Sequence, residues 1–212
     1  LARLFLLAGH APEVADDEMT YFSICMAGSI FPVLGAALAG WLSGVGRTGI
    51  VTSVTFASFL VNAILAWGLV LGNLGMPRMG IAGAAWATVA AQFVAAALYL
   101  ALFAKSGGWN DRRARAFDWP ALKHFLELAL PMGLRISGEL IAWTFFLVFL
   151  GRLGTAELAA SSIAFRINGT AFFPALGLGQ AAGVLAGQAR GAGRDQDVPS
   201  IGWQSLAACE VW

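Results

Sequence analysis

The chain has 212 residues, of which 58% are hydrophobic and only 12% are charged, and its mean hydropathy is +0.73. A soluble domain carries about a quarter charged residues, so this composition excludes a surface that faces water on all sides. The net charge of +1 gives no indication of a nucleic-acid partner. We therefore expect an all-α integral membrane protein, a polytopic bundle of transmembrane helices.

Three segments in the first half of the chain are long enough to cross a bilayer, which takes about 20 apolar residues. None of them contains a formal charge. They are Met19–Gly46, Thr48–Pro77 and Met79–Ala104, with predicted span cores near 20–42, 50–71 and 81–103. Glycine and proline in the short connections between them are typical of turns.

The second half begins with the polar stretch 105–123, the one real linker in the sequence. Two further spans are predicted near 125–150 and 156–188, and they contain charged residues. Residues 1–8 are expected to end an earlier helix and residues 201–212 to begin a later one. Because the chain starts at Leu rather than Met and stops inside an apolar segment, we expect it to be a fragment of a longer polypeptide.

Basic residues are unevenly divided between the loops. The order of the spans places eight on one side and two on the other, and an excess of Lys and Arg marks the cytoplasmic side. The eight are Arg47, Lys105, Arg112, Arg113, Arg115, Lys123, Arg190 and Arg194, and the two are Arg78 and Arg152. The linker is therefore predicted to be cytoplasmic, in a multi-pass protein of the cell (inner) membrane.

Small residues and prolines indicate how the helices pack and bend. Glycines recur every four residues along one face of the last predicted span, a spacing that lets a neighbouring helix approach closely. This helix-packing seam consists of Gly179, Gly183, Gly187 and Gly191. Pro32, Pro131 and Pro174 fall at or inside spans, where each frees a backbone carbonyl and can kink its helix.

Glu139 is the main candidate for a functional site. It lies well inside the span that follows Pro131, where an ionisable group costs a few kcal/mol to insert and is a functional candidate by default. Removal from water favours the neutral form of a carboxylic acid, so such a group can exchange a proton or a sodium ion. A side chain with a charged and a neutral state is what an ion-coupled transporter requires.

A structural role for Glu139 is the alternative. Arg135 lies four residues earlier on the same helix face, so the two side chains could simply neutralise each other. Arg166 on the next span could do the same. Other polar residues at membrane depth are more often hydrogen-bond partners between helices than ligands; they are Asn62, Gln92, Asn168 and Gln180.

Five segments, in this order along the chain, resemble the MATE (multidrug and toxic compound extrusion) transporters. The resemblance covers nearly the whole chain, and it rests on the order of the segments rather than on any one motif. The segments are residues 44–48 with Asn62, residues 75–88, residues 128–134 followed by Glu139, residues 151–160 and residues 177–193.

The resemblance implies a fold of twelve helices in two six-helix lobes. Residues 1–104 would be the end of helix three and helices four to six of the N-lobe, residues 105–123 the cytoplasmic linker between lobes, and residues 124–212 helices seven and eight and the start of helix nine in the C-lobe. Many members use an acid on the seventh helix for cation coupling, which favours that role for Glu139. Arg135, one turn away, is a departure from the family pattern.

The function implied is secondary active antiport, in which an organic and often cationic compound leaves as protons or sodium ions enter. This function needs a small-molecule substrate, a lipid bilayer and a coupling ion that could bind at Glu139, but no cofactor and no other metal, and we expect a monomer. A lipid-linked saccharide flippase of the wider superfamily stays open because of Arg135 and Arg166. A non-transporting scaffold has little use for Glu139, and no nucleophile–base or metal pair indicates an enzyme.

Overall fold

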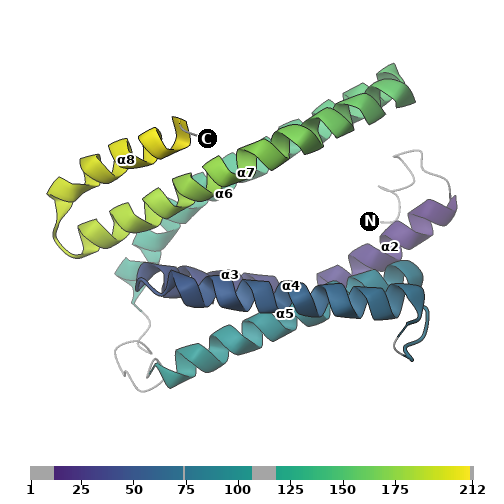
Figure 1. Cartoon of the computed structure of the whole chain (residues 1–212), viewed down its shortest axis with the longest axis horizontal. Coiled ribbons are helices and arrows are strands. Elements are labelled where there is room, and N and C mark those ends of the chain that lie inside the picture. The colour runs from purple at the N-terminus through teal and green to yellow at the C-terminus, as the bar shows by residue number, and fades with distance from the viewer. Residues whose placement is uncertain (1–11, 74, 107–117, 211–212) are drawn as a thin grey trace. The chain divides into compact units, whose positions relative to one another are not determined.

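The computed structural model describes residues 12–73, 75–106 and 118–210, with the backbone alone at 12–15, 153 and 155–158. These residues form helices and no strands (Figure 1), which confirms the predicted all-α class. The chain divides into two compact units, Leu1–Asp111 and Arg112–Trp212. The division falls inside the predicted linker 105–123, most of which lies outside the described residues, as do residues 1–8.

Within its described residues the first unit has four helices, and the described part of the second has two long helices followed by a short one. The helices of the first unit are α2 (Pro12–Ala27), α3 (Ile30–Gly44), α4 (Thr48–Leu71) and α5 (Gly80–Lys105). The second unit has α6 (Trp119–Leu153), α7 (Thr155–Gly191), the 3-10 turn η1 (Asp195–Asp197) and α8 (Val198–Glu210). Helix α8 agrees with the prediction that a later helix begins near residue 201.

Four of these helices are long and apolar enough to cross a membrane by themselves, and they confirm four of the five predicted spans. They are Thr48–Leu71, Gly80–Lys105, Trp119–Arg152 and Ala159–Gly191. The remaining span, predicted near 20–42, is broken in the structure. Helices α2 and α3 pass the same test together, and their axes differ by 50°.

Pro32 explains where the first span breaks. A proline inside a helix lacks the N–H that would bond the carbonyl four residues earlier, and its ring crowds that carbonyl. For Pro32 this carbonyl belongs to Gly28, which instead accepts a hydrogen bond from the Phe31 backbone N–H at 3.1 Å. The break therefore lies at Gly28 and Ser29, one turn before the proline. Helices α6 and α7 continue through Pro131 and Pro174.

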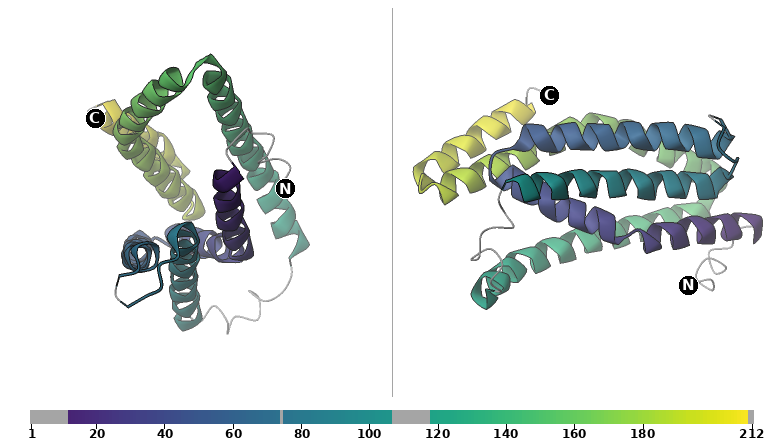
Figure 2. Two further views of the ribbon diagram at one scale, coloured as in Figure 1. Left: turned by 90° about the vertical axis from the view of Figure 1, so that its right-hand side faces the viewer. Right: turned by 90° about the horizontal axis from the view of Figure 1, so that it is seen from below.

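The first unit is held together along α5, whose small residues let its neighbours approach closely. Gly83, Ala87 and Ala91 are buried at a spacing of four residues, the pattern that brings helices together in lipid. Helices α4 and α5 run side by side (Figure 2, right). Toward the other end of α5, Tyr99 is buried with Leu42 and Val54.

The second unit is a pair of long helices joined at Gly154, with α8 folded back onto α7. Helices α6 and α7 meet at this shared end and diverge away from it (Figure 2, left). At its other end, α6 begins with a capped first turn, in which the Asp118 carboxylate accepts a hydrogen bond from the Ala121 backbone N–H at 3.2 Å. Residues at equal distances from Gly154 on the two helices consequently lie at similar levels.

Candidate functional site

Glu139 lines a cavity of about 530 Å³ on the second unit. Its lining residues on α6 recur at the helical spacing of three and four, so they share one face of the helix. Residue 139 lies about 21 Å from the Leu153 end of α6, at a rise of about 1.5 Å per residue. It is therefore well inside the membrane-length segment. The lining residues are Ile136, Glu139, Leu140, Ala142, Trp143 and Phe146 of α6 and Phe165 of α7.

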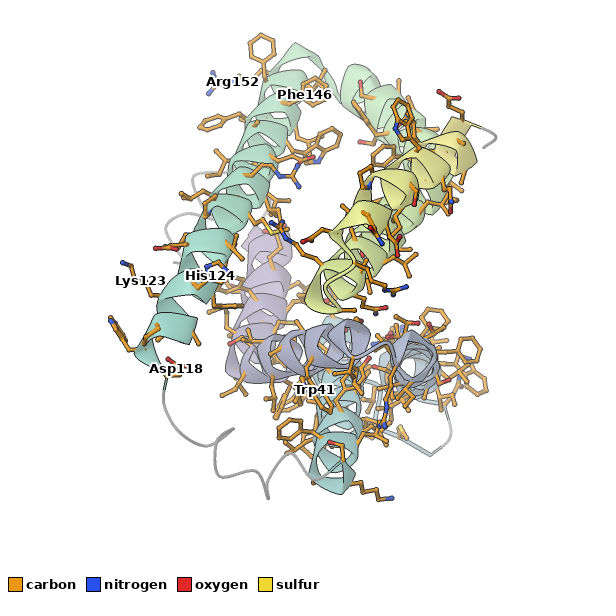
Figure 3. All side chains as sticks on the ribbon, turned by 90° about the vertical axis from the view of Figure 1, so that its left-hand side faces the viewer. Trp41, Asp118, Lys123, His124, Phe146 and Arg152 are labelled. Carbon is orange, nitrogen blue, oxygen red and sulfur yellow. The ribbon has the colours of Figure 1, made fainter. Side chains whose placement is uncertain are left out.

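Three aromatic rings form the wall of this cavity beside Glu139. Trp143 and Phe165 pack edge to face with ring centroids 4.4 Å apart, and Phe146 lies 5.5 Å from each of them. Figure 3 shows Phe146 on the part of α6 toward Arg152. The faces of such rings carry negative electrostatic potential and attract organic cations, most strongly for Trp. A carboxylate next to these rings is a chemically suitable site for a positively charged group.

The structure does not pair Glu139 with either of its candidate arginines. Within the described side chains, the ion pairs lie near the ends of helices, as in Lys123–Glu127 at 3.9 Å and Arg194–Asp197 at 3.5 Å. Arg135 shares a helix face with Glu139, but it neither bonds the carboxylate nor lines the cavity. In this arrangement the carboxylate remains available to a cation.

Arg166 lines a second cavity, of about 690 Å³, also on the second unit. Most of this cavity is formed by one face of α7, and it shares Trp143 and Phe165 with the cavity beside Glu139. The lining residues are Trp143 and Leu147 of α6 and Ser162, Phe165, Arg166, Gly169, Thr170 and Phe173 of α7. The two cavities therefore meet at one aromatic contact.

Asn62 lies in the first unit, where the structure gives it a role between helices. Its amide donates to the Thr88 hydroxyl at 3.4 Å, and Thr88 in turn donates to the Ala84 carbonyl at 3.0 Å. Asn62 is half-buried. This bond matches the interpretation of Asn62 as a hydrogen-bond partner between α4 and α5.

The sequence analysis missed the rest of this polar contact. Ser58 donates to the Ala91 carbonyl at 2.8 Å, and the Tyr99 hydroxyl donates to the Val51 carbonyl at 3.2 Å and lies 3.3 Å from the Thr55 hydroxyl. Gln92 joins Thr55, Ser58 and Tyr99 around a cavity of about 250 Å³. The sequence signal for this contact was the pair of hydroxyl residues Thr55 and Ser58, which lie three residues apart on one face of α4.

The remaining predicted residues are not brought to Glu139. Asn168 and Gln180 are exposed on α7 and line neither cavity of the second unit. The four glycines of the seam are exposed as well, and a Cβ added at any of them would meet no atom within 4 Å. Their role in helix packing stays a prediction.

Comparison with known proteins identifies the family. The family profile MatE matches residues 131–208. Proteins named "Probable multidrug resistance protein NorM" from Rhizobium meliloti (strain 1021) and Agrobacterium fabrum are each 34% identical over 90% of this chain and 42% of their own length. The relative of the same name from Thermotoga maritima is 26% identical over 90% of the chain and 42% of its own length.

The chain thus spans less than half the length of these curated relatives. No match to a solved structure was found. The family match, the NorM-like relatives and the membrane-length helices agree with the resemblance inferred from the sequence. The chain is a multi-pass membrane segment that matches the MATE family over residues 131–208 and is similar to NorM-like members over 90% of its length.

Proposed function

We propose that the whole protein is a secondary active antiporter of the cell (inner) membrane. It exports organic, often cationic, compounds or drugs and takes up protons or sodium ions in exchange. The names of the relatives support multidrug efflux as the general activity. The observation that carries the proposal is the position of Glu139, which lines a cavity of about 530 Å³ together with three aromatic side chains.

Glu139 would act as the coupling residue by alternating between a charged and a neutral form. The charged carboxylate attracts a cation into a site with apolar walls, and an entering proton neutralises it and weakens its hold on an organic cation. Sodium would need further oxygen ligands, because no group of three or more His, Cys, Asp or Glu side chains gathers in the described part of the chain. In the whole protein, alternating access would expose this site to each side of the membrane in turn.

A lipid-linked saccharide flippase is the second candidate, and Arg166 is the observation in its favour. A flippase that carries anionic headgroups needs cationic residues along its cavity. Arg166 lines a cavity on α7, whereas Arg135 lines neither cavity of the second unit. One arginine beside an acid and several aromatic rings fits a small organic substrate better than an anionic lipid headgroup.

The coupling role of Glu139 is tested with Glu139→Gln and with the double variant Arg135→Met/Glu139→Gln in the full-length protein. Gln keeps the size and hydrogen bonding of Glu but cannot cycle between charged and neutral forms. We expect Glu139→Gln to insert at normal levels and to lose cation-driven efflux of an organic dye from cells. The double variant should be equally inactive.

A purely structural role gives the opposite pattern. Removal of one partner of a buried ion pair costs about 3–5 kcal/mol, so Glu139→Gln would lower the amount of folded protein and Arg135→Met would restore it. A double variant that folds and transports normally would therefore exclude coupling at Glu139. Glu127→Gln is the matched control, because Glu127 lies on the same helix but pairs with Lys123 near its exposed end, and it should transport normally.

A further inference from the structure

The charged residues of the first unit are divided between its two ends. Phe31 of α3 packs against Phe93 of α5, with ring centroids 5.2 Å apart. Ten residues further along each helix, Trp41 packs against Phe103 at 4.9 Å, so α3 and α5 run in the same direction. Helix α2 precedes α3, and it therefore lies toward the beginning of α5. The described acids of α2 are Asp16, Asp17 and Glu18.

The opposite end of the unit carries two basic residues, Arg47 and Lys105. The Tyr99 hydroxyl donates to the Val51 carbonyl at 3.2 Å, which places these residues at one level on α5 and α4. Arg47 precedes Val51 by four residues and Lys105 follows Tyr99 by six, so they lie about 6 and 9 Å further along at about 1.5 Å per residue. The α3–α4 turn and the last turn of α5 both lie at the left of this unit in Figure 1.

These two basic side chains have no acidic neighbour in the described structure. The sequence contains no Asp or Glu between Glu18 and Asp111. Both side chains are exposed, and neither forms an ion pair with any described side chain. The turn that carries Arg47 is nevertheless fixed, because the Arg47 backbone N–H donates to the Leu42 carbonyl at 2.9 Å. Two positive charges are therefore held at one end of the unit and remain available to an anion.

The lengths of α4 and α5 place these charges at the level of the lipid headgroups. The helices have 24 and 26 residues, which corresponds to about 36 and 39 Å, whereas the hydrocarbon core of a bilayer is about 30 Å thick. Trp41, labelled in Figure 3, is half-buried near the same end. Tryptophan is enriched where the hydrocarbon core meets the headgroups.

We propose that Arg47 and Lys105 bind the phosphate of an anionic phospholipid at this end of the first unit. Guanidinium and ammonium groups both bind phosphate, the first through its planar fork and the second as a point charge. Basic residues between transmembrane helices at headgroup level are a known way to bind such lipids. A zwitterionic lipid fits less well, because its own positive group would meet two cations and no acid. The proposal does not involve Glu139 and does not rest on the proposed function.

Lipid binding to purified full-length protein in detergent tests the proposal. Native mass spectrometry would compare phosphatidylglycerol, as the anionic lipid, with phosphatidylcholine, as the zwitterionic reference. We expect phosphatidylglycerol to bind more tightly. Removal of each charge should weaken its binding about fivefold, so the double variant Arg47→Gln/Lys105→Gln should lose about 25-fold in affinity for phosphatidylglycerol and none for phosphatidylcholine. Arg47→Lys/Lys105→Arg keeps both charges and should retain the preference.

Arg78→Gln is the matched control, because Arg78 is an exposed arginine in the α4–α5 turn, at the other end of the same helix pair. It should leave binding of phosphatidylglycerol unchanged. An equal loss in Arg78→Gln would indicate unspecific attraction between the protein and anionic lipid, and full binding by the double glutamine variant would place the lipid elsewhere; either result overturns the proposal. Glycerol 3-phosphate, which lacks acyl chains, should not displace the lipid. Displacement at equal concentration would indicate a site for soluble anions and would overturn the proposal too.

Discussion

Gly83 lies where α4 and α5 come closest, and the backbone of α4 leaves no room for a side chain there. A Cβ built on Gly83 would lie 2.7 Å from the Leu69 carbonyl oxygen and 2.8 Å from its carbon. That oxygen also accepts a hydrogen bond of 2.8 Å from the Met79 backbone N–H. The carbonyl is thus fixed by the turn between the two helices and cannot move aside without breaking the bond.

We therefore expect Gly83→Ala to destabilise the full-length protein by about 1–3 kcal/mol, the usual cost of overpacking a filled contact. The midpoint of thermal unfolding of the purified protein in detergent should fall. Gly40→Ala is the control, because a Cβ at Gly40 in α3 would meet no atom within 4 Å and alanine favours the helix. An unchanged midpoint for Gly83→Ala would show that the two helices pack less closely than described.

Single residues also show how far the sequence could predict the site. Glu139 stood out because a charge is rare at membrane depth, and Asn62 because an amide is rare there too. The aromatic wall of Trp143, Phe146 and Phe165 did not stand out, because such residues are common in any apolar helix. Their grouping depends on how α6 and α7 are rotated toward each other, and one sequence carries no direct signal for that rotation.

At the scale of elements, hydropathy alone predicted four of the membrane-length helices, because each contains a long stretch of high mean hydropathy with few charges. The first span was also predicted as one run, but the structure divides it into α2 and α3. Hydropathy cannot register this break, since Gly28, Ser29 and Pro32 hardly lower the average over a span. The backbone chemistry of Pro32 decides it.

Replacement of Pro32 by alanine should partly straighten this span. Alanine restores the N–H that can bond the Gly28 carbonyl and removes the ring that crowds it. Spin labels at positions 17 and 40, in a cysteine-free full-length background, measure the change by double electron–electron resonance. From a bend of 50° and a rise of about 1.5 Å per residue, full straightening lengthens the distance between backbone positions by about 3 Å.

Pro77→Ala is the control for this measurement, because Pro77 lies in the turn between α4 and α5, outside any helix. It should leave the distance unchanged. Gly28 packs closely against Val89, since a Cβ at position 28 would lie 2.6 Å from a Val89 methyl carbon. This close packing opposes straightening of the span to some degree. An identical distance in Pro32→Ala would mean that this contact, rather than the proline, holds the bend.

At the scale of the whole molecule, the sequence predicted the class and the family better than it predicted the site. An apolar composition and ordered segments survive in any fragment of such a protein. A binding site between helices does not, because the chain spans 42% of the length of the Rhizobium and Agrobacterium relatives. The seam of glycines on α7 illustrates the difference, because a Cβ added at any of its four glycines would meet no atom within 4 Å in this chain.

The orientation of the molecule gives the last prediction. Eight basic residues against two predict that the 105–123 linker is cytoplasmic. The turn at the other end of α5, between α4 and α5, is then predicted to lie on the opposite side of the membrane. In full-length protein without other cysteines, Ser106→Cys should resist a membrane-impermeant thiol reagent in intact cells and react once the cells are opened. Asn73→Cys, in the α4–α5 turn, should react in intact cells, because it lies at the other end of the same helix pair. Labelling of position 106 from outside, with protection of position 73, would invert the assigned topology and the direction of transport that depends on it.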